Sequence, residues 1–258
     1  MVKGFLLAIQ FFTVLPIRRE IEMNNRSVSW MIGLLPLVGA IIGSITLSII
    51  FAADAFSVSP LITAFLIWLT VIVLTGGLHL DGWADVSDAY FSYKDTNKKH
   101  DILKDPRVGA FGVLSLIVLL ASKFILLLDL SMQGAAGWTW LIWVPVLSRL
   151  MIAFLLVKAP LARQDGMAYY LKRYLTERVL LKAGTVSLVA VIPLVISPEL
   201  WPLLILLLAG TIVFTIISVI FFKKAFGGIS GDSLGASVEG GELWSLILVW
   251  CYLSIVMG

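Results

Sequence analysis

The chain has 258 residues and a net charge of +3, with charged side chains at 14% of its positions and hydrophobic ones at 60%. Ordinary soluble domains contain about 25% charged and about half apolar residues, so the composition disfavours a soluble globular protein and predicts one that crosses a membrane several times. The single cysteine, Cys251, excludes an internal disulfide and a cysteine metal cluster, two histidines are too few for a multi-histidine metal site, and nothing in the charge calls for nucleic-acid binding.

The N-terminal apolar stretch, residues 4–17, is too short to cross a bilayer. Gln10 interrupts it and Pro16 closes it, which favours an interfacial or re-entrant helix. A cleaved signal peptide is the alternative, because Lys3 precedes the apolar run. No small-residue cleavage site follows, however, and the sequence Pro-Ile-Arg-Arg would be a poor one.

Later apolar stretches are long enough for transmembrane helices, which need about 20 residues each. They are residues 30–53, 60–80, 109–130, 138–157, 181–197, 200–222 and 242–257. The fifth is the weakest because it is short and contains Pro193, and it could form a tight helical hairpin with the sixth. The sequence therefore predicts an all-α, polytopic integral membrane protein with about seven spans, folded as a single domain over residues 1–258.

Positive charge alternates between the connections of these spans. The basic connections contain Arg18, Arg19 and Arg26; Lys94, Lys98, Lys99, Lys104 and Arg107; Lys158, Arg163, Lys172, Arg173, Arg178 and Lys182; and Lys223 and Lys224. The alternate connections, residues 54–59, 131–137 and 198–199, contain no Lys or Arg. By the positive-inside rule the basic side is cytoplasmic.

Three aspartates follow the second span at a helical spacing. Asp81, Asp85 and Asp88 fall at positions i, i+4 and i+7, so in a helix they share one face. Like charges on one face repel each other, and a bound cation would offset the repulsion. Carboxylates suit Mg²⁺ or Mn²⁺, and Mg²⁺ is commonly held by one or two of them together with substrate phosphates. The alternative is a solvated helix end with Asp81 as its N-cap. His79 is more typical of a hydrogen-bonded polar residue at a helix end than of a ligand.

The segment before the third span combines basic residues with a proline. Pro106 is expected to end the preceding helix, and Arg107 can contact a phosphate through two hydrogen bonds. Lys104 and Arg107 can equally be ordinary basic residues at the cytoplasmic surface, and local sequence slightly favours that reading.

Two basic residues fall inside predicted spans, Lys123 in the third and Arg149 in the fourth. Charges within a membrane usually face a protein interior or an aqueous cavity. A role in a polar cavity is favoured over a purely structural ion pair.

A glycine-rich segment, residues 227–242, follows the sixth span. Glycines permit close backbone approach and anion-binding turns, and Asp232 and Glu239 are a further possible pair of metal-binding or general-base carboxylates. A glycine-rich turn between helices would look much the same.

Four ordered motifs together resemble the cobalamin synthase family, also called the adenosylcobinamide-GDP ribazoletransferase family. They are residues 75–88 (TGGLHLDGWADVSD), 103–112 (LKDPRVGAFG), Ser148-Arg149 and 231–236 (GDSLGA). The resemblance extends over nearly the whole chain. Ala89 stands where the family usually has glycine, and Pro106 where it usually has serine. Because the acids and Arg107 are retained, these differences affect loop geometry more than chemistry.

The resemblance implies a reaction in a bacterial or archaeal inner membrane. The adenosylcobinamide phosphate moiety of adenosylcobinamide-GDP would be transferred to α-ribazole 5′-phosphate or α-ribazole, with Mg²⁺ required and GMP released. Asp81, Asp85 and Asp88 would bind Mg²⁺ and the diphosphate, and Asp232 would complete the metal site or activate the attacking hydroxyl. The remaining residues expected near substrate are Lys104 and Arg107, as phosphate ligands, and His79, Asp105, Lys123, Arg149 and Glu239.

Two other classes share part of this pattern. A membrane phosphotransferase of the CDP-alcohol type would use the same metal chemistry, but its characteristic motif spacing is absent. A cation-coupled transporter would place acids near the middle of the bilayer, whereas the carboxylates here are predicted to cluster at one surface.

Overall fold

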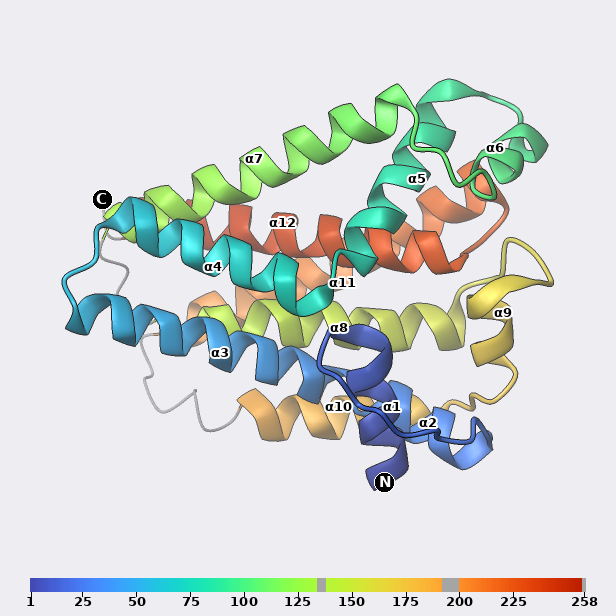
Figure 1. Cartoon of the computed structure of the whole chain (residues 1–258), viewed down its shortest axis with the longest axis horizontal. Coiled ribbons are helices and arrows are strands. Elements are labelled where there is room, and N and C mark those ends of the chain that lie inside the picture. The colour runs from blue at the N-terminus through green and yellow to red at the C-terminus, as the bar shows by residue number, and fades with distance from the viewer. Residues whose placement is uncertain (134–137, 192–199, 257–258) are drawn as a thin grey trace.

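The computed structural model describes residues 1–133, 138–191 and 200–256, and within these ranges the chain folds almost entirely into helices (Figure 1). In chain order they are α1 (Val2–Phe12), α2 (Asn25–Gly33), α3 (Leu35–Ala55), α4 (Pro60–Thr75), α5 (Leu78–Ser92), α6 (Thr96–Ile102), α7 (Ala110–Met132), α8 (Trp140–Lys158), α9 (Gly166–Lys172), α10 (Arg178–Val191), α11 (Trp201–Phe226) and α12 (Gly231–Val256). The longer helices run along the long axis of the molecule. The predicted all-α class is confirmed.

Five of these helices, α3, α7, α8, α11 and α12, are long and apolar enough to cross a membrane. Helices α4 and α5 pass the same test only as a pair, and they are bent by 87° relative to each other. The bent pair, counted as one span, makes a sixth crossing at most, and α5 turns away from the line of α4 at its end. This is roughly consistent with the predicted seven. The fifth predicted span, residues 181–197, begins within α10, but residues 192–199 and the predicted hairpin lie outside the described residues.

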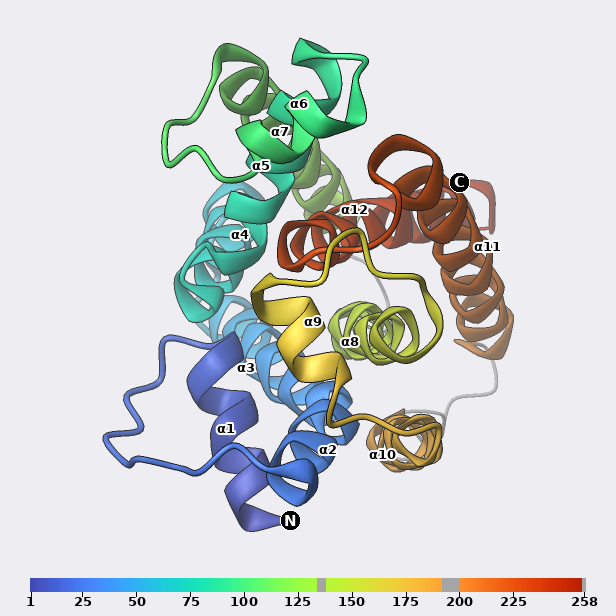
Figure 2. The ribbon, with the colours of Figure 1, turned by 90° about the vertical axis from the view of Figure 1, so that its right-hand side faces the viewer.

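Helix α8 is the core of the bundle, with α3, α10, α11 and α12 around it (Figure 2). It is buried along almost its whole length, including the large side chains of Trp140 and Trp143. Its most extensive contact is with α3. Gly39 and Gly43 of α3 lie against α8, where a Cβ on Gly43 would come within 2.5 Å of Ile142 Cα. Small residues allow this close approach of helices in membrane proteins.

The first predicted span, residues 30–53, is wrong as a continuous helix because the chain breaks at Leu34. Helix α2 begins earlier than predicted, at a capping box in which the Asn24 side chain accepts hydrogen bonds from the Ser27 and Arg26 backbone N–H groups. Helix α3 then starts with Pro36 in its first turn. Proline has no N–H to donate, and it is tolerated at a helix start but not in a helix interior.

The second predicted span, residues 60–80, is also interrupted. Helix α4 ends at Gly76 and α5 starts after Gly77, and both glycines have left-handed backbone conformations with φ of +62° and +73°. The backbone N–H of Val14 donates to the carbonyl of Leu74 at 2.9 Å, so the N-terminal segment is attached beside this bend. Because of this bend, α5 and its three aspartates lie across the end of α4 rather than in line with α4.

Replacing Gly76 with alanine should destabilise the protein more than replacing Gly77. Both substitutions place a side chain at positive φ, which costs on the order of 1 kcal/mol. At Gly76 the new Cβ would also lie 2.7 Å from Val14 Cγ1, whereas at Gly77 it would meet nothing within 4 Å. We expect thermal unfolding in detergent to show a decrease in Tm of about 2–4 °C for Gly77→Ala and a larger one for Gly76→Ala. Equal decreases would contradict the packing of Val14 on the bend.

The last predicted span, residues 242–257, starts too late. Helix α12 begins at Gly231, so most of the glycine-rich segment expected as a turn is helical. Two glycines lie at the contact between α12 and α5, Gly235 of α12 and Gly82 of α5. A Cβ on Gly235 would lie 3.2 Å from the backbone of His79, and one on Gly82 would lie 2.6 Å from the Asp232 carbonyl oxygen. Close packing of two helices, rather than a loop, therefore explains these glycines.

The basic connections gather at one end of the bundle, which we call the basic end. Figure 1 shows α6, α9 and the turn before α12 there, while the connection between α3 and α4 and the C-terminus lie at the opposite end. Helix α1 has 11 residues, shorter than a membrane crossing requires, and it packs against α2. The alternation of charge along the sequence thus corresponds to two distinct ends of the structure.

Candidate functional site

Four aspartates come together at the basic end, Asp81, Asp85 and Asp88 from α5 and Asp232 from the first turn of α12. Helix α5 turns across the end of the bundle, and burial raises the pKa of Asp85 to about 7, with further contributions from the negative charges of Asp81, Asp232 and Asp88. Burial and the like charges act in the same direction, and no ion pair to Asp85 is found within the described residues. The acidic face predicted from the spacing is therefore present, and within the part of the chain that the structure describes Asp85 has no cationic partner.

Asp81 does not cap α5, so that alternative is wrong. The N-cap is Gly77, and the backbone N–H of Asp81 donates to the Gly77 carbonyl at 2.9 Å as part of the first helical turn. The Asp81 side chain is exposed and that of Asp85 half-buried, whereas Asp88 is only 9% exposed. The three acids thus extend from solvent into the protein.

Asp88 is held against the start of α7. Its Oδ1 accepts a long hydrogen bond of 3.4 Å from the backbone N–H of Gly112, and a Cβ on Gly109 would collide with its carboxylate. A helix N-terminus favours a nearby negative charge. The glycines of the segment before the third span therefore position an aspartate, a role that the sequence analysis missed because the two segments are separate in the chain.

Asp232 lies beside α5 and close to a basic loop. The Ser230 hydroxyl donates to its Oδ2 at 3.3 Å, and Arg163 is close enough for electrostatic attraction. Arg163 precedes α9, in a connection that is fixed to the turn before α12: the N–H of Ala162 donates to the carbonyl of Ile229 at 2.9 Å. No motif surrounds Arg163 in the sequence, where it stands out only as a basic loop residue.

The other predicted phosphate ligands are exposed and paired with acids. The guanidinium of Arg107 contacts the carboxylate of Asp105 through Nε at 2.9 Å and Nη2 at 2.6 Å, which lowers the pKa of Asp105. Lys104 Nζ lies 3.8 Å from Asp165 Oδ2. Exposed ion pairs contribute little to stability, so they can exchange for a ligand.

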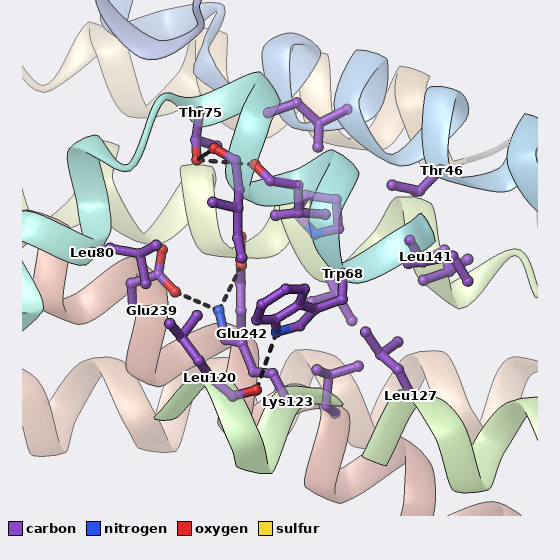
Figure 3. A pocket seen from close by; sticks show the side chains of 17 residues that line it. Thr46, Trp68, Thr75, Leu80, Leu120, Lys123, Leu127, Leu141, Glu239 and Glu242 are labelled. Carbon is purple, nitrogen blue, oxygen red and sulfur yellow. Dashed lines mark hydrogen bonds and ion pairs between the residues drawn. The ribbon is translucent and has the colours of Figure 1, made fainter. Parts of the chain in front are cut away.

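Lys123, Arg149 and Glu239 lie in a separate, buried network. Lys123 Nζ lies 2.5 Å from Glu239 Oε2 and 3.2 Å from Glu242 Oε2, while Arg149 pairs with the other oxygen of Glu242. Figure 3 shows the lysine and both glutamates beside a cavity of about 70 Å³ that is otherwise lined mostly by apolar side chains. The structural ion pairs are therefore present, and the cavity beside them is mostly apolar rather than the polar cavity that was favoured. Glu239 is paired with Lys123 rather than with a metal site around Asp232.

His79 is buried in the first turn of α5 at 3% exposure, next to the ring of Phe12. Its Nε2 has no hydrogen-bond partner among the described residues. The expectation of a hydrogen-bonded polar residue at a helix end is therefore not met at this atom.

The acidic face is compatible with Mg²⁺, although protein side chains alone do not form a cage for it. Within the described residues, no group of three or more His, Cys, Asp or Glu side chains is arranged to hold a metal ion. Mg²⁺ usually keeps several waters and takes only one or two carboxylates together with substrate phosphates. The uncompensated charge around Asp85 fits such an ion, with exposed Asp81 and half-buried Asp85 accessible to it.

Comparison with known proteins identifies the same family that the sequence motifs resemble. The model of a family described as Cobalamin-5-phosphate synthase matches residues 4–250. A protein of Geobacillus sp. strain WCH70 named adenosylcobinamide-GDP ribazoletransferase is 40% identical over 98% of this chain and 97% of its own. Proteins with the same name from Halalkalibacterium halodurans and Clostridioides difficile are 38% and 31% identical, over 96% and 99% of this chain and 95% and 99% of their own. No solved structure matches significantly.

Proposed function

Because the chain belongs to the cobalamin-5-phosphate synthase family and is therefore a transferase of cobalamin nucleotide-loop assembly, we propose that its four aspartates carry out a Mg²⁺-dependent transfer that releases GMP. The substrates would be adenosylcobinamide-GDP and α-ribazole 5′-phosphate or α-ribazole. A ribazole hydroxyl oxygen forms a bond to the phosphorus on the cobinamide side, the bond from that phosphorus to the bridging oxygen breaks, and GMP leaves with that oxygen.

The observation that carries the proposal is the placement of Asp81, Asp88 and Asp232 close enough to Asp85 for their negative charges to act on it. Asp81 and Asp85 would hold Mg²⁺ together with oxygens of the substrate diphosphate, and the buried Asp88 would add its negative charge beside them. Bound Mg²⁺ would neutralise charge on the diphosphate and on the leaving GMP. Asp88 is already oriented by Gly112, so α5 presents its acids in a fixed arrangement.

Asp232 would accept the proton of the attacking hydroxyl. Its Oδ2 is hydrogen-bonded to Ser230, and within the described residues Oδ1 receives no hydrogen bond and remains open as the acceptor. Asp232 is on α12, whereas the other three acids are on α5. The attacking hydroxyl would therefore lie on the side of α12, and the diphosphate on the side of α5. General-base catalysis by a positioned carboxylate contributes about 10²–10⁴-fold to a rate.

We place this site on the cytoplasmic side of a bacterial or archaeal inner membrane. The support is the gathering of the basic connections at the same end as the aspartates. A soluble nucleotide-activated substrate would then reach the acids from water, while the bundle stays in the lipid bilayer.

The test is GMP release by the purified protein in lipid nanodiscs, supplied with adenosylcobinamide-GDP, α-ribazole 5′-phosphate and Mg²⁺. We expect GMP to appear only when both substrates and the metal are present, and EDTA to abolish its release. CDP-alcohol substrates serve as the control for the related phosphotransferase chemistry. Release that is equally fast in EDTA would contradict the metal-dependent reaction, and turnover of CDP-alcohols alone would contradict the substrate assignment.

A further inference from the structure

Arg163 is a cation whose hydrogen-bonding capacity is largely unused. Its side chain is 23% exposed, and its Nε and Nη1 atoms are buried without a hydrogen-bond partner in the part of the chain that the structure describes. Nε does lie 2.8 Å from Asp165 Oδ1, as an ion pair whose geometry is not that of a hydrogen bond. Buried guanidinium donors without acceptors are costly, so this arrangement is suited to an anion that can accept from them.

Asp165 lies between two cations. One of its carboxylate oxygens is next to Arg163, and the other is 3.8 Å from Nζ of Lys104. Asp165 is 59% exposed and precedes α9 without making a side-chain capping hydrogen bond. Its carboxylate therefore contributes little to the local fold, and two oxygens of a phosphate group could take the places of its two oxygens.

The backbone fixes this arrangement next to the aspartates. The N–H of Ile229 donates to the carbonyl of Pro160 at 2.8 Å, which joins the loop after α8 to the turn before α12. Figure 2 shows this loop passing over the near end of α12. Because Arg163 also attracts Asp232 electrostatically, an anion bound to Arg163 would lie beside the acidic face.

We propose that Arg163 and Lys104 form a phosphate-binding pair, and that the carboxylate of Asp165 occupies the position between them when no phosphate is bound. The proposal rests on the proposed function, since the phosphate would be that of the substrate diphosphate. It assigns the binding of phosphate to Arg163 rather than to Arg107, whose guanidinium is 86% exposed and already joined to Asp105. A planar guanidinium with several donors suits a phosphate well.

Binding of inorganic pyrophosphate in EDTA, measured by calorimetry on the full chain in detergent, tests the pair without catalysis. Arg163→Gln should weaken binding about tenfold or more, as expected when a charge-assisted hydrogen bond is lost, and Arg163→Lys should restore part of the affinity. Asp165→Asn should change affinity in the opposite direction and tighten binding, because it removes the competing carboxylate. Arg173→Gln is the matched control, since Arg173 is an exposed arginine in the same connection, stacked on Tyr169.

Unchanged affinity in Arg163→Gln, or weaker binding in Asp165→Asn, would overturn the phosphate-binding pair, and so would the absence of pyrophosphate binding by the wild type. The Asp165 variant keeps the test decisive if Arg163→Gln does not fold. The GMP assay separates the two proposals: GMP release with unaltered pyrophosphate binding in Arg163→Gln refutes only the pair. Binding that depends on Arg163 without GMP release supports the pair and refutes the proposed reaction.

Discussion

Asp85→Asn should reduce the rate of GMP release by roughly 10²–10³-fold, because a metal ion supplies several kcal/mol of transition-state stabilisation and each 1.36 kcal/mol corresponds to about a tenfold change in rate. Asparagine keeps the shape of the side chain but removes the charge. Burial and, after it, the charges of Asp81, Asp232 and Asp88 raise the pKa of Asp85, so a cation bound at Asp85 would relieve an unfavourable charge. The measurement is GMP release under saturating Mg²⁺.

The same variant should fold at least as well as the wild type. The charge of Asp85 is repelled by three other aspartates and partly buried, so its removal relieves repulsion, and Tm in EDTA at pH 8 should stay equal or rise. Asp101→Asn is the matched control, since Asp101 is exposed on α6, and it should leave both rate and Tm unchanged. An active Asp85→Asn protein would refute the metal-binding role. An inactive variant with a lower Tm would contradict the prediction that removing the charge of Asp85 relieves repulsion.

Glu242→Gln should cause the largest loss of stability. Glu242 contacts both cations of the buried network, Lys123 and Arg149, and its side chain is only 8% exposed. Its loss leaves two buried cations facing the single carboxylate of Glu239. Breaking a buried ion pair from one side costs about 3–5 kcal/mol, which corresponds to a decrease in Tm on the order of 10 °C. Thermal unfolding in detergent measures it.

A second substitution separates charge balance from the loss of a contact. Glu242→Gln combined with Arg149→Gln restores an equal number of positive and negative groups, so the double variant should recover part of the stability lost in the single one. Glu177→Gln, at an exposed ion pair with Lys158, is the matched control and should have almost no effect. A single Glu242→Gln variant as stable as the wild type would show that the network does not depend on charge balance.

The elements that depend on local composition could be predicted from the sequence. A helix needs about 20 apolar residues to cross a bilayer in any membrane protein, so stretches of that length directly predicted the all-α class. The shared face of Asp81, Asp85 and Asp88 was also predictable, because a helix fixes the direction of residues spaced by three and four positions. Both predictions use only distances along one chain segment.

Features that depend on contacts between distant segments could not be predicted in the same way. The glycines near the start of α12 look like a turn in sequence, yet the lack of a side chain at Gly235 allows α5 to pack closely against α12 there. Likewise, nothing around Arg163 indicates that hydrogen bonds at Ile229 bring its loop to Asp232. The partner of Lys123 is 116 residues away in the chain. Spacing identifies charged residues inside spans but not what they contact.

The central position of α8 also constrains how the protein can be assembled during synthesis. Helix α3 ends at Ala55, and its main partner starts only at Trp140. While the intervening chain is being synthesised, the face of α3 that contains Gly39 and Gly43 has no α8 to pack against. Helix α3 is nevertheless already apolar enough to enter the membrane. Contacts such as those of α4 with α3 and α7 can form before α8 is made, but the final arrangement of the early helices becomes possible only once α8 has been inserted among them.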